Sequence, residues 1–164
     1  GLSLPSTSMP TCVRTGMSCV GAARCEQSCA NEQKIHRTLV NNFIDDMHRP
    51  ALPEALIRRR VAEGLIALWT DPAGEPVSLA GWSLPTHGVS RIGPVYTPAP
   101  HRRRGYAAAV TSAAAHRALA AGAEQVMLYT DLANPTSNGV YARLGFRRVG
   151  DASEWLFDGP AETP

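Results

Sequence analysis

VSRIGPVYTPAPHRRRGYAAAV, residues 89–110, joins an apolar stretch to an alanine-rich one through a basic loop. The part from Val89 to Thr97 is typical of a strand, but Gly93 and Pro94 interrupt it. Because proline cannot donate to a strand ladder, a Gly-Pro pair inside a strand marks a bulge or an edge where pairing stops. We therefore expect this strand to leave its neighbour partway along.

The basic loop precedes a helix predicted over residues 104–121, with Gly122 as a suitable stop. A helix begins at its positive end, so three arginines there are unfavourable unless an anion joins them or they point into water. Gly105 lets a ligand approach the backbone, Ala107 adds little bulk, and the first N–H groups of a helix have no partner within it. Such a turn can cradle a phosphate or pyrophosphate, although it lacks the signatures of a P-loop and of a dinucleotide fingerprint.

The remaining pattern completes one mixed α/β domain. The predicted elements are a helix at 35–47, a helix from Pro53, a hairpin of strands 64–70 and 77–84, a turn near His87, a buried strand at 124–131, a helix capped by Asn134 with Pro135 first, and short strands in FRRV (146–149) and EWLF (154–157). The triplet Arg58–Arg60 is interpreted as a solvated face of its helix.

The composition and net charge of the chain limit its possible functions. The chain has 164 residues, of which 44% are hydrophobic, and a net charge of +2, so we expect a single soluble domain and no broad nucleic-acid surface. No stretch is long and apolar enough to cross a bilayer, and the first residues lack a signal-peptide pattern, so we expect a cytoplasmic protein without a membrane partner.

All four cysteines lie within residues 1–30, at positions 12, 19, 25 and 29. Their spacing is not that of common zinc sites, so we expect unpaired thiols and no metal. We expect residues 1–30 to form a poorly defined or partly disordered segment without a convincing strand, and residues 31–164 to form the domain.

Arg102-x-x-Gly105-x-Ala107, between an interrupted strand and a helix, resembles the pyrophosphate-binding loop of the GNAT superfamily of N-acetyltransferases. The later segment NPTSNGVYARLGF, with Asn134, Tyr141 and Gly145-Phe146, resembles a second motif of that family. The resemblance covers residues 31–157 in architecture and 92–146 in motifs. It implies an α/β (α+β mixed sheet) fold of the acyl-CoA N-acyltransferase type, with a splayed central strand pair.

The resemblance also implies roles for particular residues. The backbone from Arg103 to Ala107 would hold the pyrophosphate of acetyl-coenzyme A, a main-chain N–H near Val95 would face the thioester carbonyl, and Tyr141 would protonate the departing thiolate. The full set of implied cofactor-binding residues is Val95, Tyr96, Thr97, Arg102, Arg103, Arg104, Gly105, Tyr106, Ala107 and Asn134. Each has a simpler interpretation: Tyr141 as a packing residue, Asn134 as a helix cap, and the arginines as a solvated run.

The function that follows is direct acetyl transfer from acetyl-coenzyme A to a primary amine of a small molecule or peptide, without a metal or a covalent enzyme intermediate. The strand at 89–97 carries no acid, so the base stays unassigned among Asp131, Glu54 and His87. Two alternatives stay open: an acyl-coenzyme A sensor without activity, and a phosphate- or RNA-binding module that uses His101–Arg104. A homodimer is also open.

Overall fold

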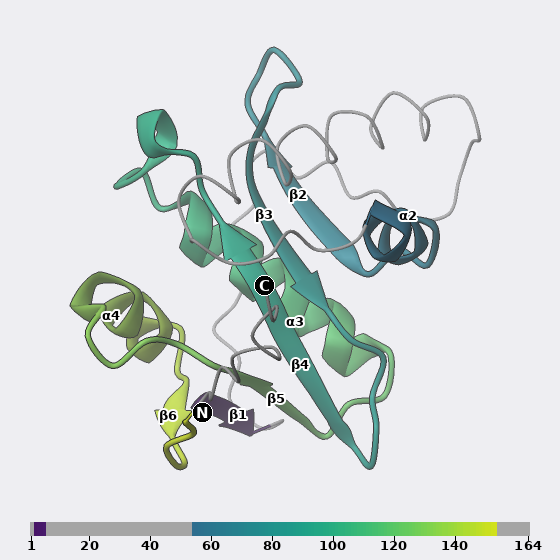
Figure 1. The fold of residues 1–164 in the computed structure, drawn as a ribbon, viewed down its shortest axis with the longest axis vertical. Helices are drawn as coiled ribbons and strands as arrows, with labels where there is room; N and C mark the ends of the chain where they lie inside the picture. Colours follow the sequence, from purple (N-terminus) through teal and green to yellow (C-terminus); the bar gives the residue numbers. More distant parts are fainter. Residues whose placement is uncertain (1, 6–53, 154–164) are drawn as a thin grey trace, which may run out of the picture.

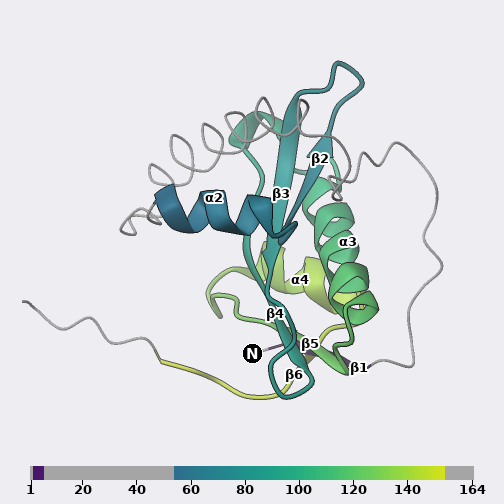
Figure 2. The same cartoon turned by 90° about the vertical axis from the view of Figure 1, so that its right-hand side faces the viewer.

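The computed structural model describes residues 2–5 and 54–153, and these form a mixed sheet with helices on both faces (Figures 1 and 2). The strand order is β2-β3-β4-β5-β1-β6. The elements are β1 (Leu2–Pro5), α2 (Glu54–Ala62), β2 (Ile66–Thr70), β3 (Pro76–Trp82), β4 (Val89–Tyr96), the 3₁₀ helix η1 (Ala99–His101), α3 (Tyr106–Ala120), β5 (Gln125–Leu128), α4 (Pro135–Arg143) and β6 (Arg147–Arg148). The predicted mixed α/β class is confirmed.

Strands β2, β3 and β4 form an antiparallel meander. The turn between β2 and β3 is organised by Asp71, whose Oδ1 accepts hydrogen bonds from the N–H groups of Ala73 and Glu75 at 3.0 and 2.9 Å. An aspartate side chain that bonds the backbone two residues on is a common device for reversing a chain. The hairpin predicted from the DPAGEP segment is therefore confirmed.

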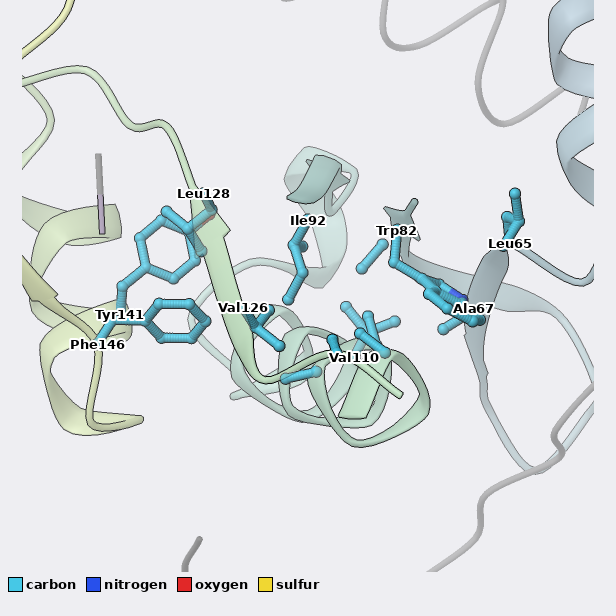
Figure 3. Packing of buried hydrophobic residues seen from close by; sticks show 14 residues of the cluster. Leu65, Ala67, Trp82, Ile92, Val110, Val126, Leu128, Tyr141 and Phe146 are labelled. Carbon is cyan, nitrogen blue, oxygen red and sulfur yellow. The ribbon is translucent and has the colours of Figure 1, made fainter. Parts of the chain in front are cut away.

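The core lies between α3 and the sheet, as Figure 3 shows in close-up. Helix α3 packs against β2, β3, β4 and β5, and its Val110, Ala114 and Ala118 are completely buried. Small alanine side chains let the helix axis approach the strands closely, where Ile92 and Leu128 fill the space above it. Helix α2 lies on the side of the sheet opposite α3 (Figure 2), near the β2 end of the sheet (Figure 1).

Strand β1 was not among the predicted elements. Leu2–Pro5 lies between β5 and β6 and is antiparallel to both, with Leu2 opposite Leu128 on one side and Arg148 on the other. The expectation that residues 1–30 hold no strand is thus wrong for these four residues. The predicted strand in FRRV is present as β6, whereas EWLF, the helix at 35–47 and the four cysteines lie outside the described residues.

Candidate functional site

The bulge predicted at Gly93-Pro94 is present in β4. Ile92 lies opposite Trp82 of β3 and Val95 lies opposite Ala80, so the single residue Gly81 faces both Gly93 and Pro94. Gly93 has a φ of 150°, a conformation that side chains essentially exclude, which explains why the bulge begins with glycine. A two-against-one bulge of this kind bends its strand and disrupts the ladder locally.

Beyond the bulge, β4 separates from β5. The parallel pairing of the two strands begins at Val89 and ends with Ile92 opposite Leu128, where β5 itself ends. Strand β4 continues to Tyr96, and in this part it is paired with β3 alone among the described strands. The prediction that this strand leaves its neighbour partway is confirmed, whereas the strand predicted at 124–131 is shorter than expected.

The separated end of β4 leads through η1 to the start of α3. The N-cap residue is Gly105, with a φ of 82°, and no side chain caps the helix. The first intrahelical hydrogen bond joins the N–H of Ala109 to the carbonyl of Gly105, at 3.1 Å, so the preceding N–H groups have no partner within the helix. Nothing lies within 4 Å of the position that a Cβ on Gly105 would occupy. No side chain therefore caps this helix start, and binding of a pyrophosphate there stays a prediction.

The three arginines before this helix are exposed. Arg102 Nε donates a hydrogen bond to the carbonyl of Thr97 at 3.1 Å, which ties the loop to the end of β4. Arg103 has a φ of 63°, so the loop backbone turns sharply at this residue. Exposure fits both the solvated and the anion-binding interpretation, and a role of these arginines in binding stays a prediction.

Asn134 caps α4, as the sequence predicted. Its Oδ1 accepts a hydrogen bond from the N–H of Ser137 at 3.0 Å, and Pro135 is the first helical residue. Asp131, which precedes this turn, accepts a hydrogen bond from the N–H of Ala133 through Oδ1 at 2.8 Å. Both side chains thus shape the segment that follows β5. Contact of Asn134 with a cofactor stays a prediction.

The hydrogen bonds at the C-terminal end of α4 fix the position of Tyr141. The N–H of Phe146 bonds to the carbonyl of Tyr141 and that of Gly145 to the carbonyl of Ala142, both at 3.0 Å, which is the Schellman pattern of a helix C-terminus. The rings of Tyr141 and Phe146 meet edge to face at 6.1 Å between centroids, beside Leu128 at the end of β5 (Figure 3). The Tyr-x-x-x-Gly-Phe spacing therefore has a structural reason of its own.

Burial raises the pKa of Tyr141. The side chain is 8% exposed, and loss of solvation raises the pKa of its phenol above the ordinary value of 10.0. The phenol is protonated at neutral pH, as an unshifted phenol would also be, so a role of Tyr141 as a proton donor stays a prediction.

Arg60 corrects the interpretation of the triplet Arg58–Arg60 as a solvated face. Arg59 is exposed and pairs with Glu63 at 2.8 Å, but Arg60 is partly buried and its Nη1 donates a hydrogen bond to the carbonyl of Gly93 at 3.0 Å. Consecutive side chains on a helix point about 100° apart, so three consecutive arginines cannot all lie on one exposed face. The spacing of four residues from Leu56 to Arg60, which places both on one helix face, was the signal that could have identified it.

Residues 2–5 and 54–153 contain neither a membrane-spanning helix nor a metal-binding cluster. No helix there is long and apolar enough to cross a membrane. No group of three or more histidine, cysteine, aspartate or glutamate side chains gathers there in a way that could hold a metal ion.

A family model and several solved structures are similar to this chain. Residues 72–156 match the family model described as FR47-like protein. The solved structure of an acetyltransferase from Trypanosoma brucei is similar over 77% of this chain and 94% of its own, with 20% identity and a TM-score of 0.60. A GCN5-related N-acetyltransferase from Sphaerobacter thermophilus is similar over 89% of this chain, with 17% identity and a TM-score of 0.65; the match spans 46% of that chain. At this identity, the likeness to solved structures concerns the fold.

One comparison concerns a short segment. A stretch of 42 residues, 26% of this chain, is 79% identical to part of the dissimilatory-type sulfite reductase subunit alpha of Allochromatium vinosum. The match spans only 10% of that subunit.

Proposed function

The chain belongs to the FR47-like family, within the GNAT superfamily of N-acetyltransferases, and from this premise we propose that it moves an acetyl group from acetyl-coenzyme A directly to a primary amine. Acyl transfer is the chemistry common to this fold. The acetyl donor and an amine of a small molecule or peptide as acceptor are our proposal. The observation that carries it is the separation of β4 from β5 after Ile92, which leads to a helix start capped by glycine.

Coenzyme A would be held by main-chain groups along this path. The pantetheine arm would lie beside β4 at Val95, Tyr96 and Thr97, in the place that a pairing strand would take. Its pyrophosphate would meet the N–H groups from residue 103 to 107, and Arg102, Arg103 and Arg104 would add attraction. Asn134 would contact the cofactor from the start of α4. When bound, acetyl-coenzyme A supplies the activated thioester.

Two groups of the chain would assist the transfer. A main-chain N–H near Val95 would stabilise the negative charge that develops on the thioester oxygen when the amine attacks. The Tyr141 hydroxyl, which is protonated at neutral pH, would donate its proton to the departing sulfur. We assign no residue as the base that deprotonates the amine.

The experiment that tests this proposal is thiol release from acetyl-coenzyme A with a panel of amines, amino acids, polyamines and peptides. We expect release with at least one class of amine. Coenzyme A binding without release from any acceptor would favour the sensor alternative. Neither binding nor release would overturn the proposal.

A further inference from the structure

Arg60 joins α2 to the bulge of β4. Its Nη1 donates to the Gly93 carbonyl oxygen at 3.0 Å, in a partly buried contact between residues 33 positions apart. Helix α2 lies on the face of the sheet opposite α3 (Figure 2), so Arg60 reaches the bulge from the face that α3 does not cover. This hydrogen bond is therefore a link between two elements rather than a local contact within one.

The backbone around Arg60 is fixed to the same part of the sheet. The carbonyl of Arg60 accepts a hydrogen bond from the N–H of Leu65 at 2.8 Å, and the carbonyl of Leu65 accepts one from the N–H of Trp82 at 2.9 Å. Trp82 follows Gly81, where an added Cβ would lie 2.8 Å from the Gly93 oxygen. The Gly93 carbonyl is thus confined by Gly81 of β3 and by the guanidinium of Arg60.

The peptide unit between Gly93 and Pro94 has an acceptor but no donor, because proline carries no N–H. A bulge disrupts the regular ladder locally, and at this bulge the Gly93 carbonyl accepts from the Arg60 guanidinium, a partner outside the sheet. A charged guanidinium donates a stronger hydrogen bond than a neutral group does. The next main-chain N–H along β4 belongs to Val95, and its direction follows from how the bulge is held.

We propose that Arg60 is a positioning residue: by holding the Gly93 carbonyl, it fixes the bulge and keeps the main-chain N–H near Val95 aimed at the thioester carbonyl. This inference rests on the proposed acetyl transfer. Because a donor to the developing charge acts on the rate rather than on binding, loss of Arg60 lowers kcat and leaves coenzyme A binding nearly unchanged.

The test compares Arg60→Ala and Arg60→Lys with Arg59→Ala in the full chain. Arg59 is the matched control, since it is a neighbouring arginine that is exposed and pairs with Glu63. We expect Arg60→Ala to lower kcat about tenfold to hundredfold, less than the roughly hundredfold to thousandfold loss when an oxyanion donor is removed, because the N–H is misplaced but still present. Arg60→Lys, which keeps a charged donor, restores part of the rate, and Arg59→Ala changes kcat less than about twofold.

A second measurement does not depend on activity. Amide hydrogen exchange at Gly93, Val95 and Tyr96 should become several times faster in Arg60→Ala than in Arg59→Ala. Unchanged exchange, or wild-type kcat in Arg60→Ala, overturns the positioning role, and so does a loss confined to coenzyme A binding. If the wild-type chain releases no thiol with any amine, the proposed function fails by itself, while the exchange result still decides whether Arg60 holds the bulge.

Discussion

Tyr141 serves two purposes at the residue scale. Its ring packs against Phe146 across the end of α4, and its hydroxyl is the proposed proton donor. The two roles depend on different atoms of one side chain. They can therefore be separated by removing the oxygen alone.

Tyr141→Phe is expected to lower turnover about a hundredfold, within the usual contribution of a general acid. The ring packing is kept, so the dissociation constant for coenzyme A should change less than about threefold. Steady-state kinetics and isothermal titration calorimetry measure the two quantities. Unchanged turnover would remove Tyr141 from the chemistry and leave it as the anchor of the helix end.

Asn134 also has an observed structural role and a proposed binding role. Both the helix cap and the proposed cofactor contact would use its side-chain amide. Asn134→Ala removes the acceptor for the Ser137 N–H and should lower the free energy of unfolding by about 1 kcal/mol, whereas Asn134→Ser keeps a cap. Urea unfolding measures this difference. If Asn134 also binds the cofactor, Asn134→Ser weakens coenzyme A binding without loss of stability. If both Asn134→Ala and Asn134→Ser keep the wild-type affinity for coenzyme A, Asn134 acts only as a helix cap.

At the element scale, the start of α3 is the part of the proposed site that can be tested most cleanly. Gly105 and Gly122 flank the same helix, with φ values of 82° and 95°, and neither would bring an added Cβ within 4 Å of another group. An alanine at either position carries the same left-handed strain, of about 1–2 kcal/mol. Only Gly105, however, lies in the proposed pyrophosphate loop.

We therefore expect Gly105→Ala and Gly122→Ala to lower the free energy of unfolding by similar amounts, about 1–2 kcal/mol each. Gly105→Ala should in addition weaken coenzyme A binding about tenfold or more, because a strained loop no longer presents its N–H groups to the phosphates. Chemical denaturation and calorimetry test both statements. Equal coenzyme A affinities in the two variants would argue against the loop.

The elements that could be predicted from sequence are those whose causes are local. Gly93-Pro94 predicts a bulge by itself, since proline lacks a donor, and Asn134-Pro135 predicts a helix start from neighbouring residues. Strand β1 could not be predicted, because four residues have too little pattern and their partners lie at the other end of the described chain. The contact of Arg60 depends on how α2 lies over the sheet, which no spacing within the triplet specifies.

At the scale of the whole molecule, the weak net charge of +2 means that attraction for a phosphate is a local property of the basic loop. A ligand that binds only the native state stabilises the entire fold. Its effect can therefore be measured without knowing the acceptor.

Coenzyme A at about one hundred times its dissociation constant should add about 2.7 kcal/mol to the free energy of unfolding and raise the Tm by roughly 5–10 °C. Raising the salt concentration from about 0.1 to 1 M shortens the Debye length from about 10 to 3 Å, so it should reduce this shift if the arginines contribute. Differential scanning fluorimetry measures both effects. A coenzyme A shift that does not depend on salt would assign the binding to the main-chain groups alone.

The position of β1 has a consequence for how the protein reaches its native state. Leu2–Pro5 leaves the ribosome long before β5 and β6, yet it pairs with both of them. The sheet therefore cannot close until β5 and β6 have been synthesised, and the meander of β2, β3 and β4, whose contacts are local, can form before it. Until β1 is inserted, β5 and β6 lack the strand that lies between them and present edges of the kind that promote aggregation, so insertion of β1 is a step at which misfolding can occur.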